Sequence, residues 1–541
     1  MATNAAMTSG TIIENSEWRW VFNASALLIV IITLPFIVAY GATPPGSQFM
    51  GMLNNPIDGA TYLADMQQGY SGAWLFHLPY TPEPHRGVFL FTFFLAMGHL
   101  ARLLNLPLTL VFHAARLVSS LLMFVTIYQL VADFTANITQ RRITWGMAIV
   151  GGGLGWLALL LGKVNPVPPD ILAQAEAFPI QAAYTNAHFP LAIAIAAWMG
   201  HALYTVALVE TDRWPRLDYL TMSLAVGTLI LISIAPYGLI PLGIGYAAVL
   251  VVLWRRRRAF PRREMAWANL VLIFGIPLAA YNGWAISEAN PEFHGWMQQN
   301  VTLSPPVWDY LIAFGLLLLL AAIGVGKSRH VLETKDVFLL TWIVSAFLLA
   351  YAPLGVQRRF LTGINAPLAI YAGVGLWRVV IPSVAERLRP LVLAAVLLLG
   401  SLSTILAIAI PLIGVRDTGQ GFYFYVTSAE IETLNWLQAN AKPADVVLAS
   451  PEFSLFVSTR GVRIVYGHEH LTPRAGERLR EVEEFYKGVN CDVTTVEGVT
   501  LVVVGRREQN LAGESKMCSP GARRVFISSD GAVSIYAISG D

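Results

Sequence analysis

Charged residues are scarce in this sequence of 541 residues, at 13% of the chain. Soluble domains carry about 25%, so roughly half of the usual charge is missing. The formal net charge is only +2, which argues against the strongly basic surface of a nucleic-acid-binding protein. Hydrophobic residues make up 55% of the chain. This balance indicates that lipid is the solvent for much of the protein.

Cysteine is also rare. Cys491 and Cys518 are the only two, too few for a disulfide framework and without metal-ligand spacing. One disulfide, if this end of the chain lies outside the cytoplasm, or two free thiols both agree with the sequence. The chain lacks a glycine-rich phosphate loop, a zinc motif and a nucleophile elbow. The run Gly151-Gly152-Gly153 falls within a predicted membrane helix, which favours close helix packing over a nucleotide loop.

Long apolar runs are abundant. Because about 20 mostly apolar residues cross a bilayer, we predict an all-α membrane domain with about eleven crossings. The predicted spans are Val21–Tyr40, Thr109–Ala132, Ile143–Leu161, Ala187–Val209, Met265–Trp284, Trp308–Gly326, Val337–Ala352, Phe360–Ile381, Leu391–Gly414 and two helices in Tyr219–Trp254 that meet at Ala235–Pro241. The first run is longer than the apolar core of a secretory signal, about 7–15 residues, so we predict a retained helix.

Val88–Leu104 is the segment that decides the orientation. If it lies along the outer surface as a juxtamembrane helix, most lysines and arginines fall in cytoplasmic loops, as the positive-inside rule requires. If it spans instead, the arginines of Arg255–Arg263 face outward. We therefore predict a cytoplasmic segment 1–20, a transmembrane domain 21–414 with an outer loop at 41–107, and an extracytoplasmic domain 415–541.

The C-terminal region has the pattern of a small α/β domain. Helices are predicted at Ser428–Asn440 and Arg474–Tyr486. Short β-branched runs predict strands at Val446–Ala449, Val462–Tyr466, Thr500–Val504 and Val533–Ala537.

Candidate site residues gather in the predicted outer loops. Asp58 lies at the membrane surface, where a carboxylate is placed to take a proton from a hydroxyl or to hold a divalent cation. Asp65 follows two helical turns later. The alternative for Asp58 is the N-cap of a surface helix. Glu83 and His85 offer two metal ligands, which is one fewer than a metal site needs; a proline-stiffened turn is the alternative.

Four further candidates are basic. Arg358 and Arg359 lie on the outer side against the charge bias, and guanidinium suits phosphate; an ion pair with an outer-loop carboxylate is the alternative. Arg116 is costly in lipid and needs a carboxylate or a lipid phosphate as partner. His188 stands at the outer end of its helix, either in a site or simply satisfied at the interface.

The layout resembles the GT-C superfamily of membrane glycosyltransferases, which includes aminoarabinose transferases and protein O-mannosyltransferases. The motifs that carry the resemblance are Asp58-Gly59-Ala60-Thr61-Tyr62, Gly72-Ala73-Trp74, Glu83-Pro84 and Ala115-Arg116-Leu117. Uncharacterised bacterial paralogues are also similar at Ala187-His188-Phe189-Pro190-Leu191, at Gln357-Arg358-Arg359-Phe360-Leu361, and in a tail with Gly467-His468, Thr472-Pro473 and Glu481–Tyr486. Gly59 stands where many members have a second acidic residue, which leaves open whether a divalent cation (Mg²⁺ or Mn²⁺) takes part.

The resemblance implies an inverting glycosyltransferase at the outer face of a prokaryotic plasma membrane. Its donor would be a sugar on a polyprenyl phosphate or diphosphate, and its acceptor a glycan, lipid or protein. Asp58 would be the base and Arg358 and Arg359 would hold phosphate, with Asp65, Glu83 and His85 in metal or donor contacts. Two alternatives remain: a transporter of lipid-linked glycans or small molecules, and a non-catalytic scaffold of the same fold.

Overall fold

The computed structural model describes residues 13–163, 167–328, 332–416, 421–492, 498–513, 515, 518 and 523–538. The chain divides into two compact units that do not follow chain order. Unit 1 consists of Met1–Leu34, His113–Ala280 and Thr302–Ile410. Unit 2 consists of Pro35–Phe112, Tyr281–Val301 and Pro411–Asp541.

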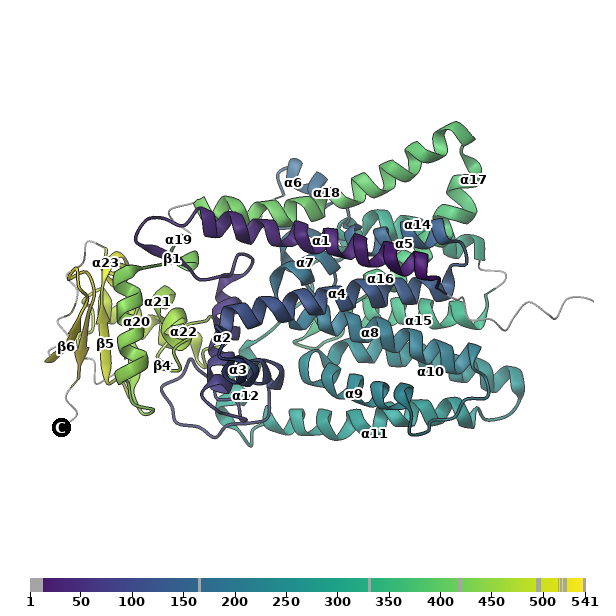
Figure 1. The fold of residues 1–541 in the computed structure, drawn as a ribbon. Coiled ribbons are helices and arrows are strands. Elements are labelled where there is room, and N and C mark those ends of the chain that lie inside the picture. The colour runs from purple at the N-terminus through teal and green to yellow at the C-terminus, as the bar shows by residue number, and fades with distance from the viewer. Residues whose placement is uncertain are drawn as a thin grey trace, which may run out of the picture. The chain divides into compact units, whose positions relative to one another are not determined.

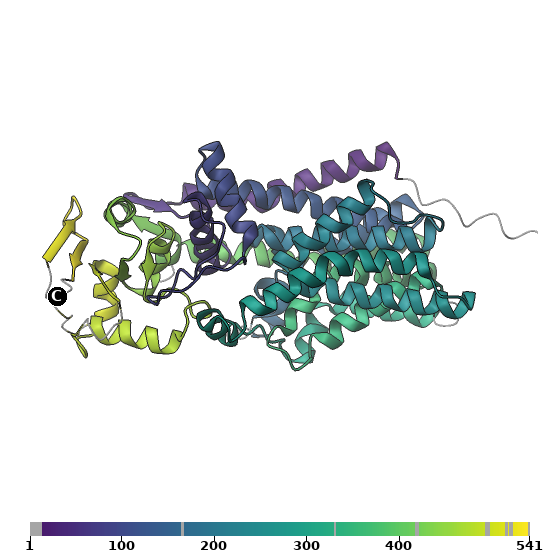
Figure 2. The same ribbon diagram turned by 90° about the horizontal axis from the view of Figure 1, so that it is seen from below.

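Unit 1 is a bundle of helices, and its long members α8, α10 and α15 run alongside one another (Figures 1 and 2). Four long helices have one end in each unit: α1 (Asn15–Gly41), α4 (Leu108–Phe134), α11 (Arg262–Ala285) and α18 (Arg389–Arg416). The remaining helices of unit 1 are α5 (Ile138–Val150), α6 (Gly155–Leu160), η1 (Pro169–Ala173), α7 (Pro179–Thr185), α8 (His188–Tyr204), η2 (Thr205–Val209), α9 (Tyr219–Ile234), η3 (Pro236–Gly238), α10 (Leu239–Arg257), α13 (Val307–Ala313), α14 (Gly315–Ser328), α15 (Thr334–Leu349), η4 (Gln357–Leu361), α16 (Asn365–Gly375), η5 (Leu376–Val380), α17 (Ile381–Ser383) and η6 (Glu386–Leu388).

The protein is a multi-pass membrane protein. Among the described residues, seven helices are long and apolar enough to cross a bilayer, and the bent pair α13–α14 makes up to eight. The predicted number of eleven is not reached by this measure because several segments are short or interrupted. Helices α9 and α15 have 16 residues each, the pair α13–α14 bends by 86°, and the predicted span Ile143–Leu161 is divided into α5 and α6.

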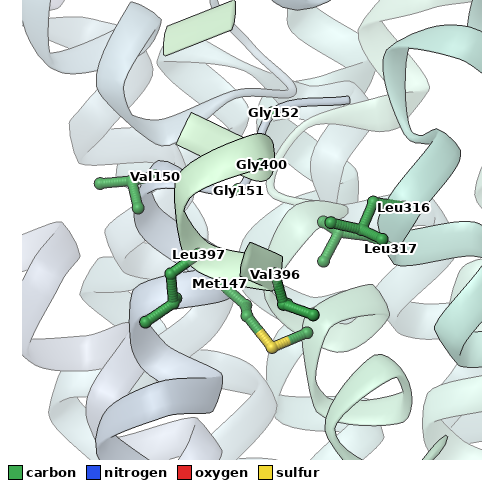
Figure 3. Close-up of a pocket in the computed structure, with 9 residues that line it drawn as sticks. All are labelled: Met147, Val150, Gly151, Gly152, Leu316, Leu317, Val396, Leu397 and Gly400. Carbon is green, nitrogen blue, oxygen red and sulfur yellow. The ribbon is translucent and has the colours of Figure 1, made fainter. Parts of the chain in front are cut away.

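The glycine run Gly151–Gly153 causes the division between α5 and α6. A Cβ on Gly153 would lie 2.2 Å from the carbonyl oxygens of Ile312 and Ala313, so only glycine allows this approach. The freed backbone is paired: the Leu154 N–H donates to Ile312 O at 2.8 Å. The run therefore does pack closely, but it also interrupts the predicted helix. A small apolar pocket lies beside it, lined by Met147, Val150, Gly151, Gly152, Leu316, Leu317, Val396, Leu397 and Gly400 (Figure 3).

Unit 2 contains the α/β fold of the C-terminal region. Its five-stranded sheet has the order β4-β3-β5-β7-β6. Strands β4, β3 and β5 run parallel to one another, and β7 pairs antiparallel with both of its neighbours, β5 and β6. The strands are β3 (Val446–Leu448), β4 (Arg463–Ile464), β5 (Leu501–Val504), β6 (Arg523–Ile527) and β7 (Ser534–Ala537). Their neighbouring helices are α20 (Ser428–Asn440), α21 (Pro451–Ser458), α22 (Ala475–Tyr486) and α23 (Arg506–Ala512).

Strand β3 is buried on both faces, as expected of a central parallel strand. Val447 belongs to one apolar cluster with Leu434 and Phe453. Val446 and Leu448 belong to a second cluster with Phe485. Successive side chains of β3 point to opposite faces of the sheet, so the strand packs against helices on both faces.

The first predicted outer loop is also part of unit 2. It contributes β1 (Ser47–Phe49), α2 (Pro56–Tyr70) and α3 (Thr92–Leu104), and the second segment of the unit adds α12 (Pro291–Gln299). Strand β1 pairs antiparallel with β2 (Tyr425–Thr427), which follows α19 (Gly421–Phe424). Helix α3 has 13 residues, too few to cross a bilayer, as the prediction of a non-spanning helix requires. Cys491 and Cys518 form a disulfide. Of the two possibilities that the sequence left open, one disulfide or two free thiols, the structure has the disulfide.

Candidate active site

Asp58 lies at the start of α2, at its third residue. The N-cap of the helix is Asn55, whose side chain accepts the Asp58 N–H at 3.2 Å. Asn55 Nδ2 also donates to Asp58 Oδ2 at 2.5 Å. Pro56 at the first helical position has no N–H to satisfy, which favours this start. The alternative that Asp58 is itself the N-cap is therefore wrong, and its carboxylate is a group held by the cap.

The other oxygen of Asp58 meets a residue that the sequence did not assign a role. His468 Nε2 lies 2.8 Å from Asp58 Oδ1, although the two residues are 410 positions apart. His468 is buried, while about a third of the Asp58 side chain, 34%, remains exposed. The carboxylate thus has a protein contact on each oxygen and a face that solvent or a substrate reaches.

Asp65 lies on the same helix in a different environment. Its side chain is buried, and Oδ1 has no hydrogen-bond partner among the described residues. Burial raises the pKa of the Asp65 carboxyl well above its usual range, because an apolar surrounding disfavours the charged form. The Asp65 carboxyl group is therefore buried inside the fold, where its neutral form is favoured.

Glu83 is engaged in ion pairs with Arg474 and Arg478. It also accepts a hydrogen bond from the Thr81 hydroxyl. Burial raises the pKa of Glu83, but the Thr81 hydrogen bond and the charge of Arg478 outweigh it and lower the pKa overall. The carboxylate therefore ties the segment between α2 and α3 to the region of α22.

His85 has both ring nitrogens in contact with the backbone. Nε2 accepts the Leu78 N–H at 2.9 Å, and Nδ1 lies 3.1 Å from the Glu83 carbonyl oxygen. This pattern fits the predicted alternative, a stiffened turn. Among the residues that the structure describes, no group of three His, Cys, Asp or Glu side chains could hold a metal ion, and the surroundings of Glu83 and His85 do not fit one.

Gly59 is closely packed against Met52. A Cβ at this position would lie 2.5 Å from Met52 Cγ and 2.9 Å from Met52 Cβ. The acidic side chain that many superfamily members carry here would require Met52 to move. Glycine at position 59 therefore fits the packing of α2 against Met52.

The arginine pair lies in unit 1, in η4. Arg358 Nε is 3.3 Å from Glu176 Oε1, and the Arg358 side chain is 35% exposed. The Arg358 N–H donates to Thr302 O at 3.2 Å. Arg359 lies with its guanidinium 5.9 Å from the centre of the Tyr237 ring. The predicted alternative of an ion pair is thus present for Arg358, in a form that leaves part of the guanidinium accessible.

Arg116 and His188 are also in unit 1. Arg116 is buried and donates to Ala183 O at 2.7 Å and to His113 Nδ1 at 3.4 Å. A backbone carbonyl thus contacts the guanidinium where the sequence predicts a carboxylate or a lipid phosphate. His188 begins α8 and contacts the Phe189 ring, with ring centres 4.2 Å apart.

Comparison with known proteins identifies the fold. No protein-family model and no curated protein matches the chain. The oligosaccharyltransferase of Archaeoglobus fulgidus matches over 96% of this chain and 74% of its own, with 12% identity and a TM-score of 0.52. ArnT from Cupriavidus metallidurans in the apo state matches over 96% of this chain and 98% of its own, with 13% identity and a TM-score of 0.51. ArnT bound to undecaprenyl phosphate matches over 97% of this chain and 98% of its own, with 13% identity and a TM-score of 0.50.

These neighbours are membrane glycosyltransferases of the GT-C type. At identities of 12% and 13% the likeness concerns the fold, and at that level the predicted resemblance to the GT-C superfamily is confirmed.

Proposed function

We propose that the protein is an inverting glycosyltransferase that moves a sugar from a polyprenyl phosphate or diphosphate carrier to an acceptor hydroxyl at the outer face of a prokaryotic plasma membrane. The observation that carries this proposal is the Asp58 carboxylate, which is one-third exposed at the start of α2 and held on both oxygens. A base on a rigid element is what attack by a hydroxyl requires.

In the proposed step, Asp58 accepts the proton of the acceptor hydroxyl while the acceptor oxygen bonds to the anomeric carbon. The bond from that carbon to the carrier's phosphate oxygen breaks, and its electron pair leaves with the phosphate. One displacement inverts the anomeric centre. A general base in this position contributes about 10²–10⁴ in rate.

Arg358 and Arg359 are proposed to bind the carrier's phosphate and to stabilise the negative charge that it gains on leaving. The Arg358 side chain is 35% exposed and lies 3.3 Å from Glu176, so a phosphate can reach the guanidinium from the exposed side. ArnT, a structural neighbour, has been seen bound to undecaprenyl phosphate, which supports a carrier of this class. Arg116 and His188 are proposed to support the same region.

The proposed step is written without a metal ion. Glu83 and His85 are engaged by arginines and backbone groups, and Gly59 supplies no second carboxylate. For the outer location, support comes from the positive-inside pattern and from the Cys491–Cys518 disulfide, since disulfides persist mainly in oxidising compartments.

The test compares Asp58→Asn with Asp65→Asn, two isosteric changes on one helix. We expect both proteins to accumulate in the membrane, and we expect transfer from a polyprenyl-phosphate sugar to fall by about 10²–10⁴ only in Asp58→Asn. Asp65 is buried and its surroundings favour the neutral carboxyl group, so an amide of the same shape should be tolerated there. Near-normal transfer by Asp58→Asn would mean that the base is elsewhere.

A further inference from the structure

His468 is presented to Asp58 by a tight turn after β4. The Thr472 hydroxyl accepts the N–H groups of Gly467 at 3.2 Å and of His468 at 3.1 Å. The His468 carbonyl accepts the N–H groups of Leu471 at 3.2 Å and Thr472 at 2.9 Å. The turn also follows the carboxyl end of a parallel strand, which is the edge where open α/β sheets bind their ligands. The backbone of His468 is therefore fixed from both sides.

Packing holds the same turn against α2. A Cβ on Gly467 would lie 2.6 Å from Tyr80 Cδ1, so the turn approaches the buried Tyr80 ring as only glycine allows. The Tyr80 hydroxyl lies 2.6 Å from the Thr61 hydroxyl, one turn along α2 from Asp58. Tyr80 thus fixes the distance between the turn and the helix that carries the carboxylate.

The hydrogen bonds assign the protonation of His468. Its Nδ1 accepts the His470 N–H at 3.0 Å, so Nδ1 carries no proton. In a neutral ring the proton then lies on Nε2, which faces Asp58 Oδ1 at 2.8 Å. His468 is a donor to the carboxylate, and neither nitrogen has a lone pair left for a substrate proton.

We propose that His468 is a positioning residue for Asp58, supplied by the C-terminal α/β fold; this rests on the proposed function. The Nε2–H fixes one carboxylate oxygen, as Asn55 fixes the other, while 34% of the Asp58 side chain remains exposed. A base held in one orientation keeps the acceptor hydroxyl in line with the anomeric carbon, and a misplacement of about 1 Å costs about 10²-fold in rate. The residue acts through Asp58 and touches no reacting atom.

The test uses two side chains of similar length at position 468. In His468→Gln an amide N–H replaces the imidazole N–H, whereas His468→Met has no donor. We expect kcat to fall about 10–100-fold in His468→Met, by analogy with the loss of an orienting partner at a metal ligand. We expect most of kcat to return in His468→Gln and the donor KM to stay within about twofold in both. His470→Ala is the control, since it keeps the backbone N–H that Nδ1 accepts and removes an exposed ring.

A double variant separates a positioning role from a structural one. If His468 acts through Asp58, adding His468→Met to Asp58→Asn causes no further loss of transfer, because the two changes remove one coupled unit. Multiplying losses would overturn the proposal, as would normal kcat in His468→Met or equal losses in the Gln and Met variants. Full transfer by Asp58→Asn alone would instead defeat the proposed function. Membrane accumulation and melting temperature, measured for every variant, show which proteins are folded.

Discussion

Asn55 and Asp58 form a closed pair at the start of α2. The Asn55 side chain accepts the Asp58 N–H at 3.2 Å and donates to the Asp58 carboxylate at 2.5 Å. Asn55 itself has φ of 52°, in the left-handed region that asparagine tolerates better than most residues. One residue therefore both caps the helix and orients the proposed base.

Replacing Asn55 should affect stability and transfer together. We expect Asn55→Ala to cost about 1 kcal/mol in the free energy of unfolding through the lost cap and to lower transfer as well, because Asp58 loses a contact. Asn137 is the matched control: it caps α5 by accepting the Gln140 N–H at 3.1 Å and lies in unit 1. Asn137→Ala should lower the melting temperature similarly and leave transfer intact. Equal transfer by both variants would limit Asn55 to capping.

Arg358 should bind the donor through its planar fork. Arg358→Lys keeps the charge but loses bidentate contact, and Arg358→Ala loses both. We expect the donor KM to rise about tenfold or more in each, since hydrogen bonds to charged groups contribute about 1.5–3 kcal/mol. Arg389→Ala, which removes an arginine paired with the exposed Glu386, is the control. Unchanged donor binding in Arg358→Ala, Arg359→Ala and the double variant would leave the pair a structural role only.

The ion pair of Glu83 with Arg478 should make stability depend on pH. Because the folded protein lowers the pKa of Glu83, the pair contributes fully above the unfolded value of about 4.3, and its contribution is lost as the pH falls through the folded value. We expect the melting temperature to drop below about pH 5, with a shallower drop in Glu83→Gln. Parallel curves for the two proteins would rule out this source of acid sensitivity.

The two arginines around Glu83 differ in burial and therefore in expected effect. Arg478 is 3% exposed and Arg474 is 51% exposed. We expect Arg478→Ala to cost about 3–5 kcal/mol, as breaking a buried pair does, and Arg474→Ala less than about 1 kcal/mol. Chemical or thermal unfolding of the purified protein measures both.

Transfer should not depend on a divalent cation. Glu83 and His85 are engaged elsewhere, and Gly59 is packed against Met52. We expect the rate to be unchanged by EDTA and by added Mg²⁺ or Mn²⁺. A loss of transfer in EDTA that Mg²⁺ or Mn²⁺ restores would show that the cation implied by the family resemblance is bound after all.

The orientation of the membrane domain can be tested with cysteines placed in the predicted cytoplasmic loops. Thr139→Cys, Ala259→Cys and Ser328→Cys should resist membrane-impermeant thiol reagents in intact cells and react after permeabilisation. The native cysteines are joined to each other and give little background. Labelling of Ala259→Cys from outside would show that the predicted orientation is wrong and would contradict the proposed outer site.

Local patterns predicted several elements well. Helix Ser428–Asn440 has the predicted bounds, because a Thr427–Glu430 capping box opens it and its apolar positions are helical in spacing. Strand β5 lies within the predicted Thr500–Val504 run. Strand β6 escaped prediction because it begins Arg523-Arg524 and lies at the sheet edge, where a charged strand does not show an apolar pattern.

The features that the sequence did not predict depend on contacts between residues far apart in the chain. The interruption at Gly151–Gly153 depends on carbonyls of Ile312 and Ala313, which no local window contains. Asp58 is predicted from its position in the first predicted outer loop and from the resemblance of Asp58–Tyr62 to a family motif. His468 appeared only as part of the Gly467-His468 resemblance, because its meeting with Asp58 depends on how a turn after β4 packs on α2 through Tyr80.

The separation of 410 residues between Asp58 and His468 also orders events during synthesis. At about 5–20 residues per second, the ribosome adds His468 roughly 20–80 s after Asp58. In that interval the carboxylate is already made, and its imidazole partner does not yet exist. A nascent chain therefore carries Asp58 without this partner while the helices between them are made, and the α/β fold that holds His468 supplies the partner later.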